Sequence, residues 1–146
     1  MKMKSPFLLS CFIAAVALLS GCATGPKFAE ARNTLPTLAP EKGRLYIYRT
    51  AVMGAAVQPD VRVNGEVVGS AKPKGFFVVD RPAGEYKVSS STEVTRTLSL
   101  TLEPGQTRYV RLNIAMGFFV GHVFPELVEP TVGEKELMKC SFTGAK

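Results

Sequence analysis

The sequence contains one histidine, His122, and three cysteines, the residue types whose ordinary pKa values best suit acid–base or nucleophilic chemistry near neutral pH. One histidine is too few for the multi-histidine clusters that hold zinc in proteins. His122 stands between Gly121 and Val123 in an apolar stretch, which is typical of a packed, hydrogen-bonded structural histidine. A nucleophile pair of His122 and Cys140 would need the fold to bring them together, and no nucleophile motif surrounds Cys140. We therefore expect no catalytic residue, no metal site and no cofactor.

The N-terminal residues have the layout of an export signal. Lys2 and Lys4 precede an apolar run over residues 6–19, and small residues then lead to Cys22. A basic start, a short apolar run and small residues before the cleavage site are features of a secretory signal peptide and not of a membrane-spanning helix. The pattern therefore predicts export and removal of residues 1–21.

The ending Leu19-Ser20-Gly21-Cys22 resembles a bacterial lipobox. This resemblance implies diacylglycerol on the Cys22 thiol, cleavage between Gly21 and Cys22, and acylation of the new amino terminus. Two or more acyl chains attach a protein stably to a membrane. Ala23 stands where an aspartate often marks inner-membrane retention, so the resemblance favours the periplasmic face of the outer membrane.

Cleavage would leave 125 of the 146 residues, which suits one domain with its own hydrophobic core. Cys11 would leave with the signal and Cys22 would be a thioether, so Cys140 would have no partner for an internal disulfide. We expect Cys140 to be a partly buried, small apolar residue, with an intermolecular disulfide or a redox role as the alternative. The net charge of +6 would favour nucleic acid in a cytosolic protein, but export removes that partner.

Beyond residue 43 the dominant period is two, which predicts strands. Leu98, Leu100 and Leu102 share one face, as expected of a half-buried strand. Asn64 and Gly65 stand between two alternating segments and predict a type I′ hairpin turn, which needs positive φ at both positions. The expected strands cover residues 44–49, 61–63, 66–68, 75–80, 86–89, 94–102 and 107–116.

The spacing of these strands predicts an all-β domain over residues 44–146, either an antiparallel β-sandwich of about seven strands or a small open barrel. A short C-terminal helix is expected over residues 134–140. Residues 22–43, rich in Pro, Ala and Thr, are expected to form the lipidated N-terminus and a flexible tether. The apolar run over residues 114–120 favours a buried central strand over an exposed patch for a partner or the membrane.

Four side chains point away from the core in this register: Tyr46, Tyr48, Tyr109 and Arg111. Tyrosine and arginine are enriched among the residues that dominate binding energy in protein interfaces. We therefore take these four residues as a candidate interaction surface.

The strand and turn segments resemble those of a family of small bacterial lipoproteins, domain of unknown function 2846 (DUF2846). The segments that carry the resemblance are residues 25–28, 43–49, 63–69, 81–86 and 104–111. The resemblance implies a compact β-sandwich on a lipid anchor. The family has no established activity, so it assigns no functional residue here.

The sequence therefore predicts a non-enzymatic, membrane-anchored lipoprotein of the bacterial cell envelope, whose β-domain binds a protein or an envelope polymer. The alternative is a small-ligand-binding lipoprotein that uses a cleft of the β-domain. An enzyme ranks third, since no spacing of carboxylates, lysines or tyrosines suggests a catalytic site.

Replacing Cys22 with serine tests the lipobox. We expect the variant to lose lipid labelling and to accumulate as an unprocessed precursor, because the serine hydroxyl does not replace the thiol as the acceptor of diacylglycerol. Metabolic labelling with a palmitate analogue and intact-protein mass spectrometry measure both effects, with Cys140→Ala as the control that keeps the label. An unchanged mass and membrane partition of the Cys22→Ser protein would rule the lipobox out.

Overall fold

The computed structural model describes residues 21–117 and 121–144. The predicted export signal, apart from Gly21, lies outside these residues. The elements in chain order are α2 (Phe28–Ala31), β1 (Lys42–Tyr48), β2 (Asp60–Val63), β3 (Glu66–Ser70), β4 (Gly75–Pro82), β5 (Gly84–Ser91), β6 (Thr95–Leu102), β7 (Thr107–Ala115), β8 (His122–Val128), α3 (Pro130–Leu137) and β9 (Ser141–Phe142).

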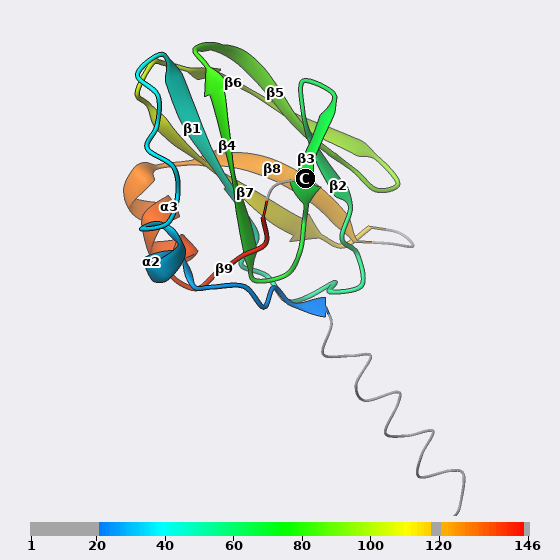
Figure 1. The fold of residues 1–146 in the computed structure, drawn as a ribbon. Coiled ribbons are helices and arrows are strands. Elements are labelled where there is room, and N and C mark those ends of the chain that lie inside the picture. Colours follow the sequence, from blue (N-terminus) through cyan, green and yellow to red (C-terminus); the bar gives the residue numbers. More distant parts are fainter. Residues whose placement is uncertain (1–20, 118–120, 145–146) are drawn as a thin grey trace, which may run out of the picture.

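The strands form two facing sheets (Figure 1). One sheet has five strands in the order β8-β7-β1-β4-β9, and the other has four in the order β3-β2-β5-β6. The prediction of a β-sandwich with a short helix near the C-terminus is confirmed. The four-stranded sheet is antiparallel as predicted, but the five-stranded sheet is mixed, because β1 pairs in parallel with β7 and β4 pairs in parallel with β9. β1 thus lies at the centre of the larger sheet, between β7 and β4.

The main core fills the space between the sheets and follows the predicted alternation. Leu100 and Leu102 are buried in it and Leu98 packs against it, whereas Thr97 and Thr101 on the same strand are exposed. Burial of one face of each strand is the main source of stability in such a sandwich.

The predicted hairpin turn joins β2 to β3. Asn64 has a φ of 49° and Gly65 a φ of 87°, so both turn residues occupy the left-handed region that a type I′ turn requires. The Asn64 side chain also accepts a 2.8 Å hydrogen bond from the backbone N–H of Lys87, which ties the turn to β5.

A second apolar cluster covers the outer face of the five-stranded sheet, where α2 and α3 pack (Figure 1). Phe28 of α2 is only 4% exposed, and its ring meets those of Tyr46 and Phe76 edge-on with centroids 5.5 Å apart. The flexible tether expected over residues 22–43 is therefore a wrong prediction. The aromatic outer face of β1 and β4 gives this segment an apolar surface to cover.

The segments before β1 and after α3 close this second cluster together. The backbone N–H of Phe28 donates to the carbonyl of Cys140 at 3.2 Å, and that of Phe142 donates to the carbonyl of Pro26 at 2.8 Å. Lys27 and Ser141 also form an isolated antiparallel bridge. Residues from before β1 and after α3 are thus hydrogen-bonded to each other.

The C-terminal helix begins at Pro130, four residues before its predicted start, and ends at Leu137. Proline is well placed in the first turn of a helix, where its missing N–H removes no hydrogen bond. Gly133, expected to precede the helix, lies inside it. A Cβ at this position would stand 2.5 Å from Cγ of Tyr109. Glycine therefore allows α3 to approach the sheet closely.

The predicted strand over residues 107–116 ends one residue early. β7 stops at Ala115, and the side chain of Met116 is 81% exposed. The expectation that the run over residues 114–120 is a buried strand is therefore wrong at Met116, and its residues 118–120 lie outside the described part of the chain. The next strand, β8, begins only at His122.

A Gly65→Val variant should be less stable than the parent by about 1–3 kcal/mol, because a branched side chain is strained at positive φ. No atom lies within 4 Å of a Cβ built at Gly65, so steric clash does not add to this loss. Urea unfolding measures the difference. Gly65→Asn is the matched control and should retain most of the stability, since asparagine tolerates the left-handed region. Equal midpoints for parent and Gly65→Val would contradict the turn's role.

Candidate functional site

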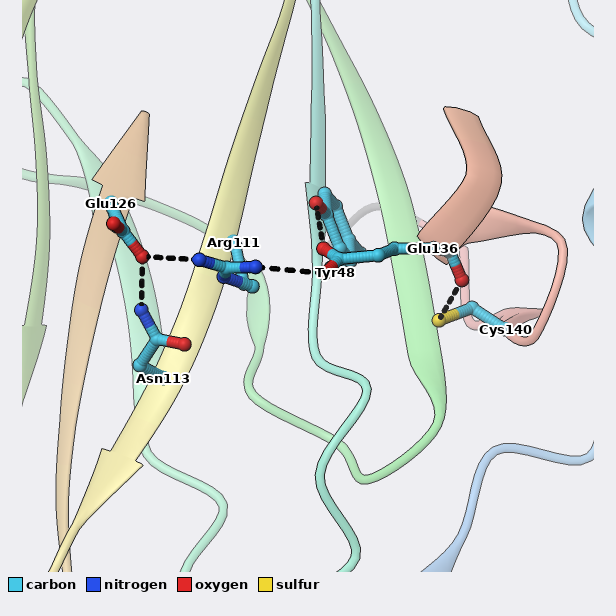
Figure 2. A network of polar contacts seen from close by, with 6 residues as sticks. All are labelled: Tyr48, Arg111, Asn113, Glu126, Glu136 and Cys140. Carbon is cyan, nitrogen blue, oxygen red and sulfur yellow. Dashed lines mark hydrogen bonds and ion pairs between the residues drawn. The ribbon is translucent and has the colours of Figure 1, made fainter. Parts of the chain in front are cut away.

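A carboxylate on α3 connects the helix to the five-stranded sheet (Figure 2). Oε2 of Glu136 accepts a 2.6 Å hydrogen bond from the Tyr48 hydroxyl. Oε1 of Glu136 forms an ion pair with Arg111 Nη1 at 2.7 Å. Both carboxylate oxygens therefore have a partner on the sheet. Because Tyr48 is buried and the other two side chains are part-buried, these charge-assisted bonds hold α3 in one position.

Arg111 extends the network to the edge of the sheet. Its Nη2 pairs with Oε2 of Glu126 on β8 at 2.8 Å, and the same oxygen accepts a 2.6 Å hydrogen bond from Asn113 (Figure 2). The hydrogen bonds from Arg111 and Asn113 lower the pKa of Glu126. The hydrogen bonds that Arg111 donates to Glu126 and Glu136 raise the pKa of Arg111. Its guanidinium is therefore a fixed cation between two carboxylates.

Two tyrosines in this region are held in their neutral form. Burial, followed by the hydrogen bond to Glu136, raises the pKa of Tyr48 far above its ordinary value. Burial and a 3.1 Å hydrogen bond to Glu134 raise the pKa of Tyr109 in the same way. Both hydroxyls therefore act as hydrogen-bond donors to α3 and stay protonated at neutral pH.

The candidate interaction surface is largely inaccessible. Tyr46, Tyr48 and Tyr109 point away from the sandwich interior, as predicted, but their exposed fractions are only 8%, 0% and 5%. The prediction that these tyrosines form a binding surface is wrong for this reason, since α2 and α3 cover them. Arg111 keeps 26% of its side chain exposed but is committed to two ion pairs.

Cys140 is fully buried beneath the C-terminal end of α3. Its Sγ lies 3.7 Å from the backbone carbonyl oxygens of Arg49 and Glu136 (the second contact is drawn in Figure 2). Burial raises the pKa of the thiol to about 11. Cys140 is therefore a packed thiol, more completely buried than predicted, and is not activated as a nucleophile.

His122 has different partners from Cys140. Its Nδ1 lies 3.3 Å from the Thr92 hydroxyl, and its Nε2 lies 3.7 Å from a carboxylate oxygen of Glu93. Among the residues that the structure describes, no hydrogen bond joins His122 to Cys140. The nucleophile pair considered in the sequence analysis is therefore not assembled there. The hydrogen bond to Thr92 agrees with the predicted structural histidine.

Within residues 21–117 and 121–144, no group of three or more histidine, cysteine, aspartate or glutamate side chains is arranged to hold a metal ion. Over the same residues, none of the helices has both the length and the apolar character needed to cross a membrane.

Arg49 is a buried cation that the sequence analysis did not single out. Its side chain is 0% exposed, and its five guanidinium hydrogen bonds, 2.7 to 3.1 Å long, all end on backbone carbonyl oxygens. Burial lowers its pKa, against a smaller opposite effect of Cys22. The signal that could have revealed this residue is the uncharged loop over residues 51–58 that follows it, because the carbonyls of such a loop need donors. The accepting carbonyls belong to Ala51, Met53, Gly54, Val57 and Ala71.

Cys22, the predicted lipidation site, lies half-buried at the same end of the sandwich. The carbonyl of Gly21 accepts a 2.9 Å hydrogen bond from the Gln58 side chain, and the N–H of Ala23 donates to the carbonyl of Pro73 at 2.9 Å. The residues on either side of Cys22 are thus fixed to the loops at this end. Lipidation itself remains a prediction.

The outer face of the four-stranded sheet carries a hollow of about 340 Å³. Its lining is mostly exposed side chains and includes one residue from the β2–β3 turn. The lining residues are Asn64, Glu85, Tyr86, Lys87, Ser99, Leu100 and Thr101.

Comparison with known proteins gives two matches. The family model described as "Protein of unknown function (DUF2846)" matches residues 39–123, more than half of the chain. An uncharacterised protein of Haemophilus influenzae is 34% identical over an alignment that covers 93% of this chain and 84% of the relative. This chain belongs to the DUF2846 family. The resemblance seen in the sequence is thereby confirmed.

The DUF2846 match spans β1 to β7 and the first two residues of β8, which is most of the sandwich. It ends before α3. Tyr48 and Arg111 therefore lie within the match, while their common partner Glu136 lies outside it. The family name assigns no activity to any of these residues.

A Glu136→Ala variant should lose about 1–3 kcal/mol of stability, because the Tyr48 hydroxyl and one Arg111 nitrogen lose their acceptor in a part-buried site. Urea unfolding followed by tyrosine fluorescence measures the loss. Lys135→Ala, an exposed position on the same helix, is the control and should change stability little. If the two variants unfold at the same urea concentration, the network does not hold α3.

Proposed function

We propose that this protein is a non-enzymatic lipoprotein of the bacterial cell envelope, anchored through Cys22, whose β-domain binds an envelope protein or polymer. The anchor and the location at the periplasmic face of the outer membrane rest on the lipobox resemblance of residues 19–22. The fold supports the anchor, because Cys22 lies partly exposed at one end of the domain, where an attached lipid can extend away from the protein surface.

The binding role is inferred from the difference between the outer faces of the five-stranded and the four-stranded sheet. The outer face of the five-stranded sheet is occupied by α2, α3 and the tyrosine cluster. The outer face of β5 and β6 instead presents exposed Lys87, Thr97 and Thr101 around the hollow. Hydroxyl, amide and charged groups at fixed strand spacing supply donors and acceptors for a polar partner.

The chemically active side chains support a binding protein over an enzyme. The Cys140 thiol is buried with a raised pKa, and Tyr48 and Tyr109 are held neutral by burial and carboxylate partners. Arg111 and Glu126 are paired with each other. Each of these groups serves to hold the fold together.

A small ligand in the hollow is the alternative. Small-molecule sites usually bury most of the ligand in a predominantly apolar pocket. The hollow is lined mainly by exposed polar side chains, among them Asn64, Glu85 and Lys87, so an extended polar partner fits it better.

A Thr101→Arg variant tests the face. The arginine lies across from Glu85 in the β5–β6 pair, which keeps folding favourable, while its long side chain fills the hollow. We expect partner binding to fall about tenfold, or about 1.4 kcal/mol. Co-sedimentation with isolated peptidoglycan measures the polymer partner, and quantitative cross-linking in native envelopes measures the protein partner.

Thr95→Arg is the matched control, since Thr95 is an exposed threonine on the same face of the same strand but outside the hollow. A His122→Gln, Cys140→Ala double variant that folds should bind like the parent. If that double variant folds but loses function while Thr101→Arg keeps it, an enzyme would become the preferred hypothesis over a binding protein. Circular dichroism confirms folding in each case.

A further inference from the structure

Three segments meet at one end of the sandwich (Figure 1). They are the N-terminal residues 21–23, the β1–β2 loop over residues 50–59 and the β3–β4 turn over residues 71–74. The hydrogen bonds from Gln58 to the Gly21 carbonyl and from Ala23 to the Pro73 carbonyl join them. Cys22 is therefore held against these loops and does not stand apart from them.

Apolar side chains project from this end. Val52 is 47% exposed, Met53 is 59% exposed, and Met116, just after β7, is 81% exposed. A Cβ built on Gly54 would lie 3.5 Å from Cγ2 of Ile114, so the β1–β2 loop adjoins the end of β7. Exposed apolar side chains gathered at one place mark a contact surface.

Four backbone carbonyls of the β1–β2 loop have hydrogen-bond donors within the protein, as an apolar environment requires. The buried guanidinium of Arg49 binds the carbonyls of Ala51, Met53, Gly54 and Val57 from the inside. Residues 51–58 carry no charged side chain. A segment that enters the edge of a bilayer needs its backbone polar groups satisfied within the protein, and here Arg49 satisfies four carbonyls.

Two lysines lie in the β3–β4 turn at the same end of the domain. Lys72 and Lys74 stand on either side of Pro73, which accepts the hydrogen bond from Ala23, and both are half-buried. Lysines beside an apolar contact surface attract anionic lipid headgroups, while the apolar side chains enter the interface.

We propose that this end of the domain, the end face made by Val52, Met53 and Met116 with Lys72 and Lys74, docks directly on the bilayer that carries the lipid of Cys22. The inference rests on the proposed anchoring and adds an orientation to it. The domain lies against the membrane, and the long axes of the strands point away from it.

The test uses the lipidated protein, purified from the envelope with a Val52→Cys substitution and labelled with an environment-sensitive dye. Cys140 does not compete for the label, because it is buried and its thiol pKa is about 11. The protein is reconstituted in liposomes of phosphatidylethanolamine and phosphatidylglycerol that contain lipids spin-labelled near the headgroup. Quenching of the dye reports its contact with the bilayer.

Val132→Cys is the matched control, since Val132 is exposed to a similar degree, 42% against 47% for Val52. It lies on α3, next to Gly133, which packs on Tyr109 near the start of β7, whereas Met116 follows the end of that strand. We expect roughly threefold stronger quenching at position 52 than at position 132. Adding Met53→Asp to the Val52→Cys protein should bring its quenching down to the control level.

The outcomes separate docking from anchoring. Equal quenching at positions 52 and 132 in protein that floats with the liposomes would overturn the docking and leave the anchor standing. Protein that does not float at all would contradict both. Flotation with strong quenching at position 52, but with an unmodified Cys22 by mass, would support the docking and contradict the lipid anchor.

Discussion

One end of this fold depends on the hydrogen bonds that the buried guanidinium of Arg49 donates to backbone carbonyls. Its guanidinium fixes the loop over residues 51–57 and the carbonyl of Ala71, while its backbone N–H donates to Gly75 and its carbonyl contacts Cys140. A buried charge is tolerated only when its hydrogen bonds are satisfied, and five carbonyls meet that need here. A lysine has three donors and would leave two of these carbonyls unpaired. The end of the central strand, the β1–β2 loop and the C-terminal segment are therefore positioned by one residue.

Local signals in the sequence predicted local structure well. The Asn64–Gly65 turn and the leucines of β6 depend on neighbouring residues, and both are found as expected. The parallel pairing of β1 with β7 has no such signal, because side chains alternate in the same way in parallel and antiparallel strands. The same limit explains Arg49. Alternation places it on the inner face after Ile47, but only the folded loop reveals what its guanidinium binds.

The tyrosines show most clearly what a strand pattern leaves open. Alternation predicts that Tyr46, Tyr48 and Tyr109 leave the main core, and they do. It does not predict whether another segment covers that face, since the cover comes from residues distant in sequence. α2 and α3 both lie outside the part of the chain that matches the DUF2846 model. The cover is held on the sandwich by the carboxylates of Glu134 and Glu136, by the ring of Phe28 and by the pairing of β9 with β4.

The hydrogen bonds between the segments around Phe28 and Phe142 also set the order in which the molecule can be completed. A ribosome delivers the residues before β1 earlier than those after α3. Because β9 and Cys140 belong to the cover of the aromatic face, the second cluster cannot close before residues 140–142 have been synthesised. The newborn chain therefore carries Tyr46, Tyr48 and Phe76 without their final cover until residues 140–142 have emerged. Transiently exposed apolar side chains favour aggregation, so the chain is exposed to it until the cluster closes.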